Sequence, residues 1–455
     1  MKQLKKRINF MFENKKIFIL GMARSGYEVA KVLAKRNNIV IVNDFSTNQD
    51  MDKVHELENM GVKVILGSHP DDILTKDFDY LIKNPGIRND HKYVLFCHKN
   101  NIPVINEIEM AYHLLPKNVK IIGITGSNGK TTTTTLIYEI LKDAGQRVHL
   151  TGNIGFPLSG FLNKIQENDY IVIEIAGHHL VNFQNFKTDI SILTNLYPVH
   201  LDFHDTYDNY KNIKKKIFDH HTNKDIAIIN GGNSDCIETT KDIKSTKYFF
   251  STTRKCDAYL ENNIIYYQNK PIIDTTKTIL KGNHNYENMM CAIIAGINLN
   301  INITSIQKTS ENFKGVEHRI EYVNTINGVK YYNDSKSTNN MATTIAISAF
   351  HEPINLILGG LDRGQDFFEL KDHMQNVKNV LCYGEPKDKI KNFCDKINIP
   401  CLVFNNLKET VEKAKQISLS GEIVLFSPAC ASWDQYKCFE DRGLEFKNLV
   451  NNNKQ

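Results

Sequence analysis

The chain has 455 residues, a formal net charge of +5 at pH 7 and 24% charged residues. This length exceeds what a single hydrophobic core supports, so we expect two to four domains. The charge is small and spread along the chain, which argues against a nucleic-acid partner. The nine cysteines include no C-x-x-C pair, a pattern that favours reduced thiols over a disulfide framework or a zinc site.

The first twenty residues are basic, but their apolar runs are short and interrupted by Asn, Glu and Lys. They lack the apolar segment and the small-residue cleavage site of a signal peptide. No run of about 18 apolar residues occurs elsewhere, so we expect no membrane span. These patterns predict a cytoplasmic protein.

Three series of short apolar runs follow one another along the chain. The first extends from KIFIL (16–20) to IPVINE (102–107), the second begins at KIIGITG (120–126), and the third begins near VKYYNDSK (329–336). Strands that alternate with helical patterns are typical of parallel βαβ units. We therefore predict an α/β protein with three domains, at residues 1–110, 111–314 and 315–455.

The first series carries a glycine pattern after its first predicted strand. Gly21, Ala23 and Gly26 are followed by Asp44 at the end of a second strand. This spacing is similar to a dinucleotide-binding fingerprint, and it also fits any nucleotide diphosphate docked on a helix N-terminus. A nicotinamide-dependent oxidoreductase is one interpretation, but it leaves the later motifs unexplained.

The segment TGSNGKTT (125–132) joins a predicted strand to a predicted helix. Gly126 and Gly129 allow a tight turn whose N–H groups face phosphate oxygens. Lys130 adds a positive charge, and Thr131 offers a hydroxyl to Mg²⁺. The strict G-x-x-x-x-G-K-[ST] pattern would have its first glycine where this chain has isoleucine. We predict that the loop binds phosphate at the positive end of the following helix.

Acidic and imidazole side chains follow the next strands of the second series. Glu174 ends the strand YIVIE, and His200 and His204 follow a later strand. Because ligands bind at the carboxyl ends of parallel strands, these groups are candidates for a second metal site. A zinc site is an alternative without a supporting ligand spacing, and its candidate ligands are His178, His179, His200 and His204.

Eight segments together resemble the Mur ligases of peptidoglycan synthesis: GITGSNGKTT, TGNIG, HLDFH, GNHNYEN, HRIEYV, NDSKSTN, LGGLDRGQDF and SPACASWDQYKCFEDRG. They occur in order over nearly the whole chain. NDSKSTN combined with SPACASWDQ is similar to the D-glutamate-adding members. The resemblance implies a Rossmann-like N-terminal domain for a UDP-linked substrate, a central P-loop domain for ATP and a Rossmann-like C-terminal domain for the amino acid.

The resemblance also implies an activity. Such an enzyme uses ATP to join D-glutamate to UDP-N-acetylmuramoyl-L-alanine through an acyl phosphate, in cytoplasmic peptidoglycan precursor synthesis. Charge on the transferring phosphoryl group must be neutralised, which implies Mg²⁺, with two ions expected. The implied partners are these small molecules, and the implied state is a monomer.

The resemblance assigns residues to each ligand. For ATP these are Gly126, Ser127, Asn128, Gly129, Lys130, Thr131, Thr132, Asn288, Arg319, Asp334 and Lys336. For the UDP-linked substrate they are Gly21, Arg24, Ser25, Gly26, Asp44, Asn84, Pro85, Gly86 and Asn153. For D-glutamate they are Thr338, Arg363, Ser432 and Phe439, with arginine at a position where lysine can occur in other members.

The implied catalytic residues are Lys130, Glu174, His200 and Lys214, and the implied metal ligands are Thr131, Glu174, His200 and Lys214 as a carbamate. A carbamate converts the lysine cation into an anion that can approach Mg²⁺. Lys215 or Lys216 is the alternative if the register of the resemblance shifts.

One segment departs from the family pattern. Where the family usually has E-x-S-S-F-Q-L, this chain reads EIAGHHL (174–180), so two hydroxyls are replaced by Ala176 and Gly177 and two imidazoles follow. We expect the metal-binding acid to be kept and substrate positioning to change. The remaining interpretations are a related ATP-dependent ligase, such as a sibling Mur ligase or a folylpolyglutamate synthase, and a nucleotide-binding protein without turnover.

Overall fold

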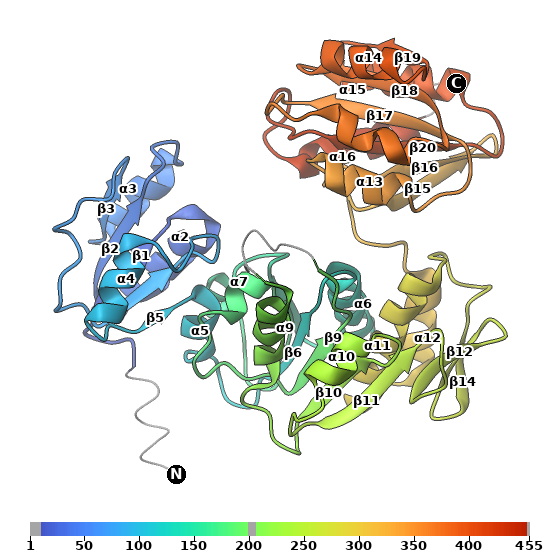
Figure 1. The fold of residues 1–455 in the computed structure, drawn as a ribbon. Helices are drawn as coiled ribbons and strands as arrows, with labels where there is room; N and C mark the ends of the chain where they lie inside the picture. The colour runs from blue at the N-terminus through green and yellow to red at the C-terminus, as the bar shows by residue number, and fades with distance from the viewer. Residues whose placement is uncertain (1–10, 199–205, 453–455) are drawn as a thin grey trace. The chain divides into compact units, whose positions relative to one another are not determined.

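The computed structural model describes residues 11–198 and 206–452. The chain divides into two compact units, Met1–Phe313 and Lys314–Gln455. The described residues form three sheets, two in the first unit and one in the second (Figure 1). The predicted α/β class is confirmed. No helix in the described part of the chain has the length and apolar character needed to cross a membrane.

The first sheet is entirely parallel, with strand order β3-β2-β1-β4-β5. Its strands are β1 (Lys16–Leu20), β2 (Ile39–Asp44), β3 (Lys63–Leu66), β4 (Tyr80–Lys83) and β5 (Val104–Ile105). Its helices are α2 (Ala23–Ala34), α3 (Met51–Asn59), α4 (Lys92–Lys99) and α5 (Glu107–Tyr112). Strand β1 is buried almost throughout, because a parallel sheet is covered on both faces and its central strands are therefore continuously apolar.

The second sheet has nine strands in the order β14-β13-β12-β11-β10-β9-β6-β8-β7. They are β6 (Lys120–Thr125), β7 (Val148–Gly152), β8 (Tyr170–Glu174), β9 (Ile190–Leu193), β10 (Ile226–Asn230), β11 (Thr246–Ser251), β12 (Ala258–Glu261), β13 (Ile264–Tyr267) and β14 (Lys270–Asp274). Pairing is parallel from β7 to β12, and two antiparallel hairpins then complete the sheet. The helical segments are α6 (Lys130–Asp143), η1 (Leu158–Phe161), α7 (Gly177–Leu180), α9 (Tyr207–Lys215), η2 (Lys216–Phe218), α10 (Ser234–Thr239), α11 (Asn283–Asn298) and α12 (Ile303–Asn312).

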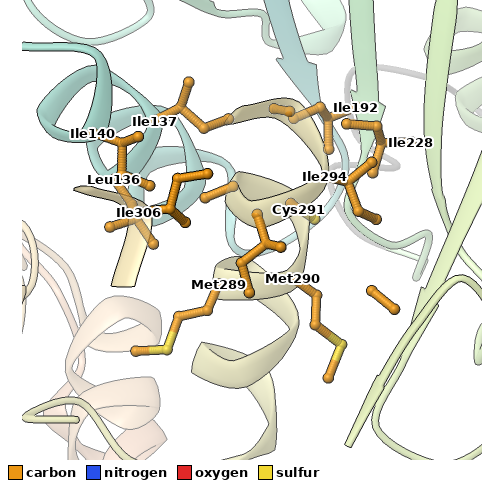
Figure 2. Close-up of a cluster of buried hydrophobic side chains, with 14 of the residues drawn as sticks. Leu136, Ile137, Ile140, Ile192, Ile228, Met289, Met290, Cys291, Ile294 and Ile306 are labelled. Carbon is orange, nitrogen blue, oxygen red and sulfur yellow. The ribbon is translucent and has the colours of Figure 1, made fainter. Parts of the chain in front are cut away.

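A large apolar core lies between this sheet and helices α6, α11 and α12. Figure 2 shows Ile294 of α11 beside Ile192 and Ile228 of strands β9 and β10, with Ile137 and Ile140 of α6 on the other side of α11. All five side chains are buried. Because buried apolar groups resist displacement, this core fixes helix α6, and therefore the loop that precedes it, against the sheet.

The second unit contains a six-stranded sheet of order β15-β16-β20-β17-β18-β19, in which only β15 is antiparallel. Its strands are β15 (Glu321–Ile326), β16 (Val329–Asn333), β17 (Ile354–Gly360), β18 (Val377–Gly384), β19 (Cys401–Val403) and β20 (Ile423–Ala429). The helical segments are α13 (Asn340–Ile347), η3 (Phe367–His373), α14 (Lys387–Lys396), α15 (Leu407–Ile417) and α16 (Phe439–Asn451). Strands β17 and β20 are buried along their whole length, so they form the centre of the sheet.

Asparagine closes many of the tight turns. Of the fifteen non-glycine residues with positive φ in the described ranges, eleven are asparagine. Asn262 and Asn263 turn β12 into β13, and Asn327 precedes Gly328 in the turn between β15 and β16. These pairs have positive φ at both central positions, which matches the right-handed twist of a two-residue hairpin.

Candidate active site

The predicted phosphate loop lies between β6 and α6, and both of its glycines are required there. Gly126 has φ +144° and Gly129 has φ +79°, values that disfavour other residues. A Cβ atom at Gly126 would collide with Thr194 Oγ1, and one at Gly129 would lie 2.5 Å from Asn288 Oδ1. Asn288 in turn accepts a hydrogen bond from Thr133 Oγ1 (3.1 Å), so helix α11 is fastened to α6 beside the loop.

Polar residues from neighbouring segments hold the loop in shape. The backbone N–H of Asn128 donates to Asn195 Oδ1 (2.8 Å), and Ser127 Oγ shares a hydrogen bond with the Tyr210 hydroxyl (2.8 Å). Lys130 Nζ donates to the carbonyl oxygens of Gly126 (3.0 Å) and Ser127 (2.8 Å). The Lys130 cation therefore lies over the predicted phosphate loop. Sequence reasoning missed Asn195 and Tyr210, although Asn195 lies two residues beyond the end of β9.

Glu174 ends strand β8, next to β6 in the sheet, and only 1% of its surface is exposed. Its Oε1 atom accepts a hydrogen bond from Asn153 Nδ2 (2.7 Å). Its Oε2 atom is buried and has no hydrogen-bond partner among the described residues. An unpartnered buried carboxylate oxygen is costly, and a cation satisfies it. Glu174 together with the buried Thr131 hydroxyl therefore fits the oxygen ligands that Mg²⁺ prefers.

Lys214 is the buried member of three consecutive lysines. Its Nζ atom donates to Thr125 Oγ1 (3.1 Å) at the end of β6, whereas Lys215 pairs with Asp242 (2.6 Å). Burial, assisted by repulsion from Lys130, holds the pKa of Lys214 well below its ordinary value, while Glu174 opposes this shift. A neutral amine is the form that reacts with CO₂, so Lys214 is chemically suited to carry a carbamate. His200 and His204 lie outside the described residues.

The segment that departs from the family pattern begins helix α7. The backbone N–H of Ala176 donates to His179 Nδ1 (3.2 Å), and Asn106 Nδ2 donates to the carbonyl oxygen of His179 (2.7 Å). Burial lowers the pKa of His179 well below its ordinary value, with a further contribution from His178. The neutral imidazole therefore satisfies a backbone N–H at the start of the helix, as a side chain at the third helical position does in a capping box.

In the described ranges, no three His, Cys, Asp or Glu side chains are grouped as metal ligands.

The residues assigned to the UDP-linked substrate gather at the carboxyl edge of the first sheet, except Asn153. Asp44 Oδ2 accepts a hydrogen bond from the N–H of Met22 (2.7 Å), and Asn84 Nδ2 donates to Ser25 Oγ (3.1 Å). Pro85 and Gly86 follow, and Gly86 N–H donates back to Asn84 Oδ1 (3.0 Å).

The helix after β1 lies close to the strand that precedes it. A Cβ atom at Gly26 would collide with the carbonyl oxygen of Gly21, which explains the small residue at this position of α2. Arg24 on the same helix donates through Nη1 to the carbonyl oxygen of Gly155 (3.3 Å), close in sequence to Asn153. This hydrogen bond therefore links helix α2 to the segment that carries Asn153.

In the second unit, Arg319 lies between two residues with strained backbone. His318 has φ +62° and the β-branched Ile320 has φ +44°, which is a rare conformation for such a residue. The N–H of Ile320 donates to Asp334 Oδ1 (3.1 Å), and the N–H of Lys336 donates to the carbonyl oxygen of His318 (3.0 Å). Three residues assigned to ATP thus share one loop cluster, and such strain is typical of functional sites.

A buried arginine joins the end of β17 to the loops that follow β16 and β20. Arg442 of α16 is fully buried, and its Nε atom donates to Ser335 Oγ (3.1 Å). Its Nη1 atom donates to the carbonyl oxygens of Gly359 (3.4 Å) and Ala431 (3.1 Å), and its Nη2 atom to that of Ser335 (2.8 Å). The residues assigned to D-glutamate lie on or beside these loops: Thr338, Arg363, Ser432 and Phe439. Sequence reasoning missed Arg442, although it lies within the quoted motif SPACASWDQYKCFEDRG.

The comparisons with known proteins agree with this arrangement. Residues 124–296 match the family model of the Mur ligase middle domain, and residues 318–430 match that of the Mur ligase, glutamate ligase domain. The UDP-N-acetylmuramoylalanine–D-glutamate ligase of Lactococcus lactis subsp. lactis is 40% identical over 446 residues, covering 98% of this chain and 99% of the relative. This chain belongs to the Mur ligase family. The enzyme of the same name from Bacillus pumilus is 40% identical over 444 residues, covering 97% of this Mur ligase and 98% of the relative.

Solved structures show the same fold. The UDP-N-acetylmuramate-alanine ligase MurC from Thermotoga maritima has a TM-score of 0.58 at 17% identity and covers 96% of this Mur ligase and 100% of that chain. The MurF ligase from Thermotoga maritima in complex with ADP has a TM-score of 0.56 at 16% identity and covers 90% and 95%. The resemblance recognised in the sequence motifs is confirmed.

Gly129→Ala should weaken ATP binding while leaving the protein folded. The new Cβ would lie 2.5 Å from Asn288 Oδ1 at a φ of +79°, so the loop must leave its phosphate-binding conformation to relieve the strain. Restoring that conformation on binding costs about 1–3 kcal/mol, which corresponds to a loss of about 5- to 150-fold in affinity. Isothermal titration with ATP measures the effect. Gly145→Ala is the matched control, since Gly145 has φ +75° beyond the other end of α6, with open space around it. Equal ATP affinity in the two variants would contradict the prediction.

Asp334 should make the stability of the second unit depend on pH. Burial raises its pKa from 3.8 to about 6, so the folded state holds this proton more tightly than the unfolded state. Stability should therefore fall as pH rises from about 4 to about 6, by about 3 kcal/mol in total, with the full loss present above pH 6.

Asp334→Asn cannot ionise and should remove this contribution. Urea denaturation between pH 4 and pH 7 should show the variant gaining stability relative to the wild type as pH rises. Asp372→Asn, at an exposed acid of the same unit, is the surface control. A difference between Asp334→Asn and wild type that stays constant with pH would show that Asp334 is not the source.

Proposed function

We propose that this Mur ligase adds D-glutamate to UDP-N-acetylmuramoyl-L-alanine at the expense of ATP, giving UDP-N-acetylmuramoyl-L-alanyl-D-glutamate, ADP and phosphate. The observation that carries the proposal is identity of 38–40% over nearly the whole chain to ligases named for this reaction. The reaction belongs to peptidoglycan precursor synthesis, and its nucleotide substrates assign it to the cytoplasm. The proposed state is a monomer.

In this proposal the substrate carboxylate attacks the γ-phosphate of ATP, forming an acyl phosphate and releasing ADP. The amine of D-glutamate then attacks the acyl carbon, and the tetrahedral intermediate expels phosphate to leave an amide. The N–H groups of the phosphate loop and the Lys130 cation neutralise charge on the transferring phosphoryl group. Bound Mg²⁺, with two ions proposed, would supply further positive charge, and the residues to hold it are Thr131, Glu174, His200 and Lys214 as a carbamate.

The remaining assignments divide among three segments. Residues 1–110 bind the UDP-linked substrate, with Asn153 contributed by the next segment. Residues 111–314 hold ATP through the phosphate loop and Asn288. Residues 315–455 supply Arg319, Asp334 and Lys336 to the nucleotide, and bind D-glutamate through Thr338, Arg363, Ser432 and Phe439.

Phosphate release is the direct test of the reaction. With ATP, Mg²⁺ and UDP-N-acetylmuramoyl-L-alanine present, we expect release on adding D-glutamate and none above background with L-glutamate or meso-diaminopimelate. A preference for another amino acid would reassign the enzyme to a sibling reaction. ATP binding without release under any of these conditions would support a nucleotide-binding protein without turnover.

Lys214→Ala should abolish turnover while ATP binding is retained. The variant cannot form a carbamate, and loss of a charge that stabilises the reacting group costs about a hundredfold or more in kcat. Preparation of the wild type without bicarbonate should lower activity, and added bicarbonate should restore it. Lys215→Ala, at the neighbouring lysine that pairs with Asp242, should keep activity within about twofold. Full activity of Lys214→Ala would remove this lysine from the mechanism.

A further inference from the structure

The carboxyl ends of β17 and β20 carry an arginine and a tryptophan in matching positions. The two strands are parallel neighbours, and the N–H of Leu361 donates to the carbonyl oxygen of Ala431 (2.9 Å) just beyond their ends. Arg363 follows two residues after Leu361, and Trp433 follows two residues after Ala431. The two side chains therefore leave the same edge of the sheet side by side.

The guanidinium of Arg363 stacks on the indole of Trp433, with 4.5 Å between Arg363 Cζ and the ring centroid. Within residues 11–198 and 206–452, its N–H groups make no hydrogen bond and no ion pair with a carboxylate. The adjacent acid, Asp362, is paired with Lys389 instead. Arg363 is therefore a cation whose in-plane donors are unused and whose orientation is set by an aromatic face.

Trp433 is itself unusual in its exposure. It is 63% exposed and is the only tryptophan in the chain, whereas tryptophan is highly buried on average. Its neighbour Ser432 is buried, so the chain turns one side chain inward and the next outward at the edge of the sheet. An indole this exposed contributes little to the hydrophobic core. Its stacking with the Arg363 guanidinium indicates that it orients that side chain.

Stacking suits the recognition of a carboxylate. A guanidinium that rests one face on an aromatic ring keeps its N–H edge free, and this edge matches the two oxygens of a carboxylate. Holding the side chain in place before binding also reduces the entropy lost when the ligand is bound. Lysine at this position would offer a point charge without a fixed plane.

We propose that Trp433 is a positioning residue that holds Arg363 ready for a carboxylate of D-glutamate. This inference rests on the proposed function, which supplies the amino acid. Because Trp433 acts through Arg363, its removal should weaken binding of the amino acid and should not change binding of the two nucleotide substrates.

Steady-state kinetics of Trp433→Leu test the proposal. We expect KM for D-glutamate to rise about fivefold or more, the loss that corresponds to a cation–π contact, with kcat nearly unchanged. KM for ATP and for UDP-N-acetylmuramoyl-L-alanine should stay within about twofold of the wild type. Trp433→Phe keeps an aromatic face and should restore most of the affinity. Leu419→Ala, at an exposed apolar residue before the other end of β20, should change none of these constants.

Two further results decide whether Trp433 acts through Arg363. In an Arg363→Met background, Trp433→Leu should cause no additional rise in KM for D-glutamate, because the side chain that it positions is already gone. Because the chain has one tryptophan, intrinsic fluorescence reports on this site alone. With a non-hydrolysable ATP analogue and the UDP-linked substrate bound, D-glutamate should change the emission saturably, and L-glutamate should not.

The outcomes separate this inference from the proposed function. If the wild type turns over D-glutamate but Trp433→Leu has an unchanged KM for it, the positioning role of Trp433 is wrong and the function stands. Equal rises in KM for all three substrates would likewise show a general structural effect. If the wild type shows no turnover with D-glutamate, the proposed function itself fails.

Discussion

Parallel strand pairing decides where chemistry can occur in this chain. Parallel neighbours bring their carboxyl ends to one edge of a sheet, and the strands themselves are buried on both faces, so polar side chains collect where strands end. Asp44 ends β2, Glu174 ends β8, and Asp334 follows β16 directly. The phosphate loop follows β6 in the same way. Each sheet therefore has one edge that can bind a ligand. The strand topology alone determines the position of that edge.

Polar groups at these edges are buried, and their partners come from the loops. Arg442 donates hydrogen bonds to the loops after β16 and β20 and to the end of β17, and Asp334 accepts one from the strained backbone at Ile320. Burying a charge is costly unless its hydrogen bonds are made, so each of these residues is stable only while the loops keep their conformation. The loops depend on these buried groups in turn. Without their hydrogen bonds, the strained backbone of the loops would relax to another conformation.

Local signals in the sequence predicted the α/β class and the position of the phosphate loop, because Gly126, Gly129 and Lys130 act within a few residues of one another. Arg442 could not be found in this way, since it contacts Ser335 across more than a hundred residues of chain. The capping role of His179 also needed the structure, because it depends on which ring nitrogen faces the N–H of Ala176. The antiparallel hairpins of β12 to β14 were missed because their turns, at Asn262–Asn263 and at Gln268–Asn269, contain no glycine.

The asparagines at tight turns also act on the unfolded chain. Glycine would adopt positive φ without strain, but it gives the unfolded backbone more freedom, worth about 0.4–1 kcal/mol at each compatible position. Asparagine tolerates the left-handed conformation through local hydrogen bonds of its side chain while retaining a Cβ atom. At eleven described positions, asparagine in place of glycine lowers the conformational entropy of the unfolded chain. Part of the free energy of unfolding of this Mur ligase therefore comes from the lower conformational entropy of its unfolded chain, and not from contacts in the folded structure.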